Sequence, residues 1–102
     1  MLEKLTSTDF SRYLNEKFQL KTEGLEPFEV ELIQVRELGE DVPADETNRR
    51  RRPFSIVFRG PEDMYLPQAI YPLEHPQMGR LDIFLVPIGL DKKGMKFEAV
   101  FT

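Results

Sequence analysis

The chain has 102 residues, a formal net charge of −4, one histidine and no cysteine. This length predicts one domain that buries enough surface to fold unaided, and the lack of cysteine excludes disulfides, thiol nucleophiles and cysteine-based metal sites. The acidic balance argues against general nucleic-acid binding, and no apolar run approaches the ~18 residues of a membrane span.

The first predicted element is a helix over about residues 6–17. Ser7 or Thr8 can cap its start, and Phe10, Tyr13 and Leu14 recur on one face. Such a helix buries one apolar stripe, so we expect it to pack across an end or an open side of a sheet.

Two strands are predicted next, over about 17–21 and 28–38. The second alternates cleanly at Phe28, Val30 and Leu32, and then Ile33 and Val35 take over the apolar positions. Because a shift of one residue would turn half of a strand to solvent, this pattern predicts a bulge near Leu32 and Ile33.

Residues 39–52 carry a run of acids followed by four arginines, with little apolar content. We expect a mobile loop here. The arginines could instead dock an acidic partner surface, although the preceding acids offset much of their charge. These residues are Arg49, Arg50, Arg51 and Arg52.

Four more strands are predicted over about 53–59, 69–75, 81–88 and 95–101, separated by turns that contain glycine. The strand at 81–88 is apolar on both faces, which predicts a central strand with the N-terminal helix on its outer side. The fold class is therefore mainly β (α+β), as one curled antiparallel sheet or a small six-stranded barrel with one N-terminal helix over a single domain of residues 1–102.

Catalytic chemistry has few candidates. His75 beside Glu74, or with Asp63 brought near by the fold, could serve a small hydrolytic or ligand-binding barrel. The alternative is structural: His75 begins a turn with Pro76 and can hydrogen-bond to its backbone, so His75→Ala would cost about 0.5–1.5 kcal/mol. Asp82 alternates with apolar neighbours and is expected to face solvent, and no catalytic, metal or cofactor site is predicted.

Aromatic and proline residues gather before and within the strand at 69–75. Tyr65, Gln68 and Tyr71 lie close to Pro72, which removes a donor from the strand ladder and so predicts an edge strand or a face turned away from pairing. Aromatic side chains at such an edge can anchor a protein interface, so we expect a partner contact centred on residues 64–71, although both tyrosines could instead belong to the core.

Several motifs in the second half of the chain resemble a group of small uncharacterised bacterial β domains. The resemblance covers about half of the chain, and Ala69 departs from the glycine that commonly follows the glutamine. It implies a compact β domain, often found in gene clusters with phage-tail-like or tail-collar proteins, and no reaction or cofactor. The motifs that carry it are Phe58-x-Gly60-Pro61, Leu66-x-Gln68-x-x-Tyr71-x-Leu73-x-His75-Pro76-x-x-Gly79, Phe84-Leu85-x-Pro87-Ile88-Gly89 and Phe97-Glu98-Ala99-x-Phe101.

Taken together, the sequence predicts a non-enzymatic protein-binding or assembly module. Its partner would be another protein or a second copy of the chain, with no nucleic acid and no membrane involved. The first residues do not have the pattern of a signal peptide, and the lack of cysteine favours an intracellular, cytoplasmic location, since a small secreted domain more often carries disulfides.

Overall fold

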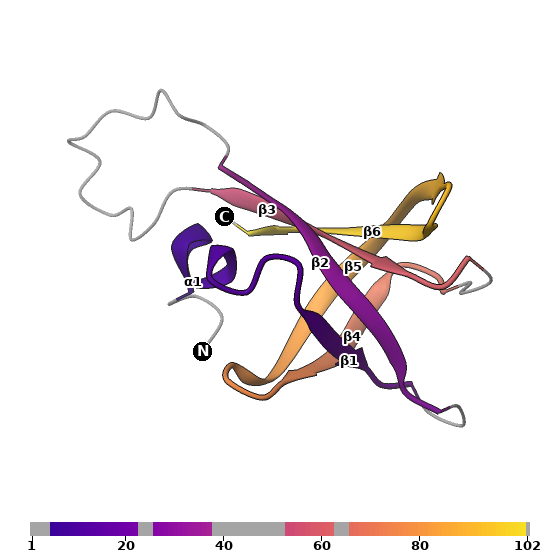
Figure 1. Cartoon of the computed structure of the whole chain (residues 1–102), viewed down its shortest axis with the longest axis horizontal. Coiled ribbons are helices and arrows are strands. Elements are labelled where there is room, and N and C mark those ends of the chain that lie inside the picture. Colours follow the sequence, from indigo (N-terminus) through magenta and orange to yellow (C-terminus); the bar gives the residue numbers. More distant parts are fainter. Residues whose placement is uncertain (1–4, 23–25, 38–52, 63–65, 102) are drawn as a thin grey trace.

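The computed structural model describes residues 5–22, 26–37, 53–62 and 66–101. It contains one short helix and six strands, which close into an antiparallel barrel in the order β1-β2-β3-β6-β5-β4 (Figure 1). The predicted fold class is therefore confirmed, with the barrel as its form. The elements are α1 (Ser7–Ser11), β1 (Lys17–Leu20), β2 (Phe28–Glu37), β3 (Phe54–Gly60), β4 (Ala69–His75), β5 (Gly79–Asp91) and β6 (Gly94–Phe101).

Strand β5 is longer than the predicted 81–88 because it serves two neighbours in turn. Its first half, Gly79–Leu85, pairs with β4, and its second half, from Val86 to Asp91, pairs with β6. The register with β6 shifts between Pro87 and Gly89. A bulge accommodates a proline and bends a strand, so β5 bends here while it remains paired with β6 on both sides of the bulge.

The predicted bulge in β2 is confirmed. The register with β3 shifts between Leu32 and Gln34. Val30 and Leu32 are buried before the shift, and Val35 packs against the core after it. The extra residue therefore keeps both halves of a long strand turned to the same core, and it helps the sheet to curl.

The barrel interior is filled by side chains that alternate along every strand. Phe54 and Phe101 stack with ring centroids 4.8 Å apart, and Phe10 of α1 packs on both. Figure 1 shows α1 at one end of the barrel, beside the end of β6. The inward-facing core residues of the strands include Phe18, Leu20, Val30, Leu32, Phe54, Ile56, Phe58, Leu73, Leu81, Ile83, Leu85, Phe97, Ala99 and Phe101.

The N-terminal helix ends earlier than predicted. Thr6 and Asp9 form a capping box at its start, but α1 stops at Ser11 instead of residue 17. Asn15 has φ 72°, and its N–H donates to the Leu32 carbonyl over 2.6 Å, while the Leu32 N–H donates to Glu16. The prediction was wrong because residues 12–16 continue as hydrogen-bonded turns, in which the Asn15 N–H donates to Leu32 of β2 instead of to a carbonyl within the helix.

The expected position of the helix on the outer side of β5 is also wrong. Helix α1 packs chiefly against β2 and β3. The outward-facing Phe84 of β5 is instead half exposed. The apolar outer face of β5 is therefore not covered by α1.

The predicted edge at Pro72 is wrong as well, because β4 pairs with both β5 and β1. The Pro72 carbonyl accepts from the Lys21 N–H over 3.0 Å, and β1 ends one residue earlier at Leu20. In an antiparallel strand the N–H and C=O of one residue point the same way. The missing donor of Pro72 thus faces β1, where it ends that ladder, and leaves the ladder with β5 intact.

Candidate functional site

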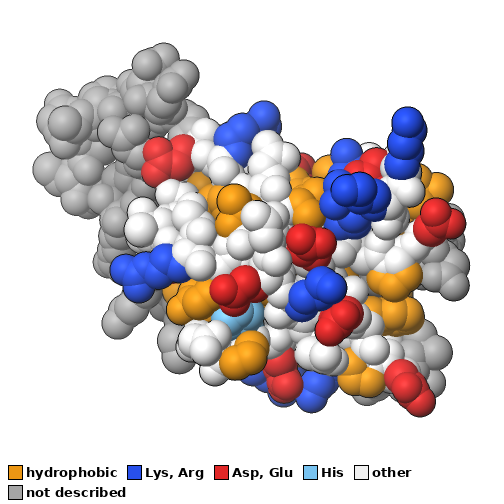
Figure 2. Space-filling model, in the orientation of Figure 1, with side chains coloured by type: hydrophobic (Ala, Val, Ile, Leu, Met, Phe, Trp, Pro, Cys, Tyr) orange, Lys and Arg blue, Asp and Glu red, His pale blue; other side chains and the backbone are white. Residues whose placement is uncertain are grey.

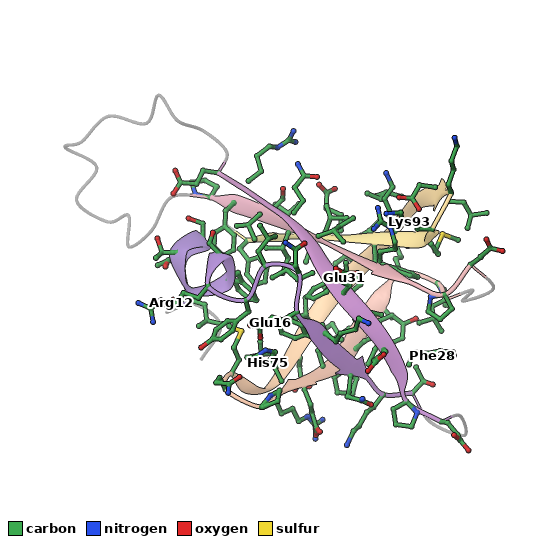
Figure 3. The ribbon with its side chains drawn as sticks, in the orientation of Figure 1. Arg12, Glu16, Phe28, Glu31, His75 and Lys93 are labelled. Carbon is green, nitrogen blue, oxygen red and sulfur yellow. The ribbon has the colours of Figure 1, made fainter. Side chains whose placement is uncertain are left out.

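His75, at the end of β4, was the main candidate for chemistry, and it lies in a buried cluster at the β4–β5 turn. Its Nδ1 accepts from the backbone N–H groups of Gln77, over 3.0 Å, and Met78, over 3.3 Å. Its Nε2 lies 2.7 Å from Oε1 of Glu16. Figure 3 shows Glu16 and His75 next to each other beneath α1.

These contacts define the state of the imidazole. A nitrogen that accepts from two N–H groups carries no proton, so the proton of the neutral ring is on Nε2 and is donated to the Glu16 carboxylate. The ring packs between Tyr13 and Phe18, with centroid separations of 4.5 and 4.6 Å. Only 1% of the His75 side chain is exposed. Both nitrogens therefore hold the turn and the segment before β1, so the ring has the structural role that was the alternative to catalysis.

The proposed pairing of His75 with Glu74 is wrong. Glu74 points outward on β4, and its carboxylate lies 3.1 Å from Nζ of Lys21. Adjacent residues of a strand face opposite sides of the sheet, so His75 and Glu74 cannot meet. The other proposed partner, Asp63, lies outside the described residues.

A shallow hollow of about 430 Å³ borders the same turn. Its lining comprises Gln19, Glu74, His75, Pro76, Gly79 and Arg80. Because the lone pair of Nδ1 is occupied by the turn and Nε2–H by Glu16, His75 offers this hollow neither a free base nor a free donor.

Asp82 is exposed and accepts from Nε of Arg80 over 3.3 Å, as expected for a solvent-facing position. Within the part of the chain that the structure describes, no three His, Asp or Glu side chains gather closely enough to hold a metal ion. In the same residues, no helix has the length and apolar character needed to cross a membrane.

A second polar cluster fixes the turn between β5 and β6. Arg59 donates from Nε, over 3.0 Å, and from Nη2, over 2.6 Å, to Oδ2 of Asp91. The N–H groups of Lys93 and Gly94 donate to Oδ1 of the same carboxylate. These hydrogen bonds, chiefly from Arg59 and then Lys93, lower the pKa of Asp91 to about 2. The cluster holds a hairpin, and sequence analysis did not single it out.

The predicted partner-binding residues differ in their exposure. Tyr71 is a core residue, and its hydroxyl donates to the Pro67 carbonyl over 2.6 Å. Burial raises the pKa of its phenol. The assignment of Tyr71 to a binding surface is therefore wrong, since inward positions of β4 face the barrel interior. Gln68 is exposed. Tyr65 and Arg49, Arg50, Arg51 and Arg52 lie outside the described residues, as does the predicted loop at 39–52.

A surface that the sequence analysis did not assign lies on the outside of β4 and β5. Ile70 and Phe84 are directly paired in the register of the two strands, and they are 65% and 50% exposed. Val100 on β6 is also exposed. The signal was present as the two-sided apolar pattern of β5, but it was interpreted as a surface for α1.

The face that carries β1 and β2 differs from this surface. Figure 2 shows acidic and basic side chains interspersed over it, with apolar side chains only in small areas. Glu29, for example, lies 3.9 Å from Lys17 across the two strands. Large exposed apolar side chains are therefore characteristic of the β4–β5–β6 side.

Comparisons with known proteins give one result that covers the whole fold. Neither the curated proteins nor the solved structures contain a significant match. A family model, described as a domain of unknown function (DUF6916), matches residues 5–101, which include α1 and all six strands. The chain thus belongs to the DUF6916 family, whose function is not established.

Proposed function

We propose that this domain is a non-enzymatic protein-binding or assembly module that docks through the outer surface of β4 and β5. The observation that carries the proposal is the in-register pair of Ile70 and Phe84 on that surface. Contiguous exposed apolar surface marks interaction sites, whereas single scattered apolar side chains are normal on a protein surface.

The interior of the barrel favours the same function. Inward positions of the strands are filled by packed aromatic and aliphatic side chains, so the described barrel encloses protein and not a ligand. Its outer surface is therefore the part that remains to make contacts. The closed ladder also holds Ile70 and Phe84 in fixed positions, which lowers the entropic cost of binding.

The energetic contribution of this pair suits a docking contact. Full burial of an isoleucine or phenylalanine side chain contributes about 1.5–3 kcal/mol, and roughly half of each side chain is still exposed here. Covering both would contribute about 2–3 kcal/mol, the size of an interface hot spot. Gln68, exposed just before β4, extends the surface toward the contact predicted around residues 64–71.

The resemblance to domains encoded near phage-tail-like or tail-collar proteins suggests the setting of such a contact. We extend the proposal accordingly: the partner is another subunit of a tail-like assembly, or a second copy of this chain. A rigid module with one apolar surface suits a part that is fixed between larger subunits.

The test compares the full chain with Ile70→Ser and Phe84→Ser in two assays. Sedimentation velocity over a concentration series measures self-association, and a pull-down from the native host, read by mass spectrometry, identifies other partners. Leu90→Ser is the matched control, because Leu90 is 61% exposed near the far end of β5.

We expect both surface variants to lose association while the control keeps it. Thermal unfolding of each variant checks that the domain still folds. Recovery of only a small metabolite or a metal, with Phe84→Ser indistinguishable from the wild type in both assays, would overturn the proposal.

A further inference from the structure

One acidic side chain lies within the apolar surface of the barrel. Glu98 faces outward on β6, where the register places it opposite Val86 of β5 on one side and Val57 of β3 on the other. It is half-buried, and Val57 is buried. Within the described residues, the Glu98 carboxylate forms no hydrogen bond and no ion pair. A carboxylate is thus held in an apolar frame without a counter-ion from those residues.

Among the described residues, the charged groups near this carboxylate do not pair with it, and Arg59 on β3 is bound to Asp91. Lys96 is on the same face of β6, two residues or about 6.6 Å along the strand, and makes no ion pair with Glu98. On the other side of Phe84, Asp82 pairs with Arg80, and both side chains are mostly exposed, so that pair contributes little.

Any partner that covers Phe84 and Val86 also covers Glu98, because Val86 and Glu98 are directly paired. Burying a carboxylate without a counter-ion costs several kcal/mol, whereas a cation that forms a hydrogen-bonded pair offsets this cost. For a purely apolar partner, the free-energy cost of burying Glu98 would therefore offset the binding free energy gained by covering Phe84. A partner that brings a cation to Glu98 keeps both contributions.

Resting on the proposed function, we infer that the docking surface selects a protein segment that places a lysine or arginine on Glu98 and a large apolar side chain on Ile70 and Phe84. The separation between the two contacts follows from the strands. Glu98 is one strand across and two residues along from Phe84, or about 8 Å. In the partner, residues two apart in a strand or one turn apart on a helix are separated by about 5–7 Å, and the long side chain of lysine or arginine spans the remaining distance.

The test is selection of random peptides by display on the immobilised wild-type chain, repeated on Glu98→Lys. We expect the wild type to enrich peptides with lysine or arginine beside leucine, isoleucine or phenylalanine. Glu98→Lys should enrich aspartate or glutamate at the same place. Glu29→Lys, the same change at an exposed acid on β2, should select as the wild type does.

Binding of the best basic peptide is then measured by fluorescence anisotropy. We expect the dissociation constant to rise about tenfold or more for Glu98→Lys and for Phe84→Ser, and to rise with salt. Glu29→Lys should leave it unchanged within about twofold, since Glu29 is far outside the surface. Circular dichroism confirms that each variant is folded.

The outcomes separate this inference from the proposed function. Enrichment of acidic or uncharged peptides whose binding is lost in Phe84→Ser would overturn the charge selection and leave the docking surface standing. The inference would be overturned if the peptides bind Phe84→Ser as tightly as the wild type, or if no peptide is enriched. The proposed function would then still be tested by sedimentation velocity and the pull-down, which measure association of the full chain with its partner.

Discussion

His75→Ala is expected to destabilise the domain by about 3 kcal/mol, well above the 0.5–1.5 kcal/mol that one hydrogen bond would give. The structure shows why. The imidazole accepts from the turn at Gln77, donates to Glu16 and fills the space between Tyr13 and Phe18. Its removal therefore affects three elements at once.

The magnitude can be built from these contacts. Loss of the acceptor for the Gln77 N–H costs about 1 kcal/mol, and the cavity left by a buried ring costs about 2 kcal/mol more. The Glu16 contact adds only about 0.5 kcal/mol, because the Glu16 side chain is half exposed. For a domain of this size, a total of about 3–3.5 kcal/mol corresponds to a fall in Tm of roughly 12–28 °C.

Two further variants separate the roles of the ring nitrogens. Asparagine places its side-chain oxygen near the position of Nδ1, so His75→Asn should restore the bond to the turn and recover about 1 kcal/mol. Glutamine places its amide nitrogen near Nε2, so His75→Gln should restore only the weaker contact with Glu16. Urea unfolding followed by circular dichroism measures the free energy of unfolding of each variant.

The expected order of stability is wild type, then His75→Asn, then His75→Gln, then His75→Ala. A cost of less than about 1 kcal/mol for alanine would refute the structural role that the contacts assign to the ring. An order in which glutamine is clearly better than asparagine would refute the tautomer, since it would make the Glu16 contact the dominant one.

Two further predictions concern the β5–β6 turn. Gly94→Ala should lower the free energy of unfolding in urea by more than about 3 kcal/mol, because φ is +154° and a Cβ would overlap the Gly60 carbonyl oxygen. Gly89 has φ +132° and open space around it, so Gly89→Ala should cost only the backbone strain of about 1–3 kcal/mol. For Asp91, the folded pKa of about 2 lies below its ordinary value of 3.8, so its contribution to stability is present above about pH 4 and is lost as the pH falls toward 2. Asp91→Asn, which lacks the charge that Arg59 binds, should flatten the pH dependence of Tm between pH 4 and 2, and an unchanged slope would contradict this.

Local periodicity in the sequence was enough to predict the β framework. Alternation of apolar residues and turn glycines located the six strands, because a strand exposes a repeat of two residues directly in the chain. The phase error at Leu32 and Ile33 likewise predicted the bulge in β2. Such features are encoded within a few neighbouring residues, so they do not depend on the rest of the fold.

Features that join distant segments were decided only by the tertiary structure. The partner of His75 is Glu16, 59 residues away, and not the neighbouring Glu74. The helix stops at Ser11 because Leu32 offers hydrogen bonds to the chain beyond it. A local pattern carries no information about which remote backbone or side chain will come within hydrogen-bond distance.

The candidate docking surface follows the same division. The sequence showed that β5 is apolar on both faces, but it could not show which face the rest of the chain would cover. Closure of the barrel buried Leu81, Ile83 and Leu85, and α1 packed at the end of the barrel, so that Phe84 stayed exposed. Exposure is decided by what packs over a residue, and that is a property of the assembled fold and not of the strand itself.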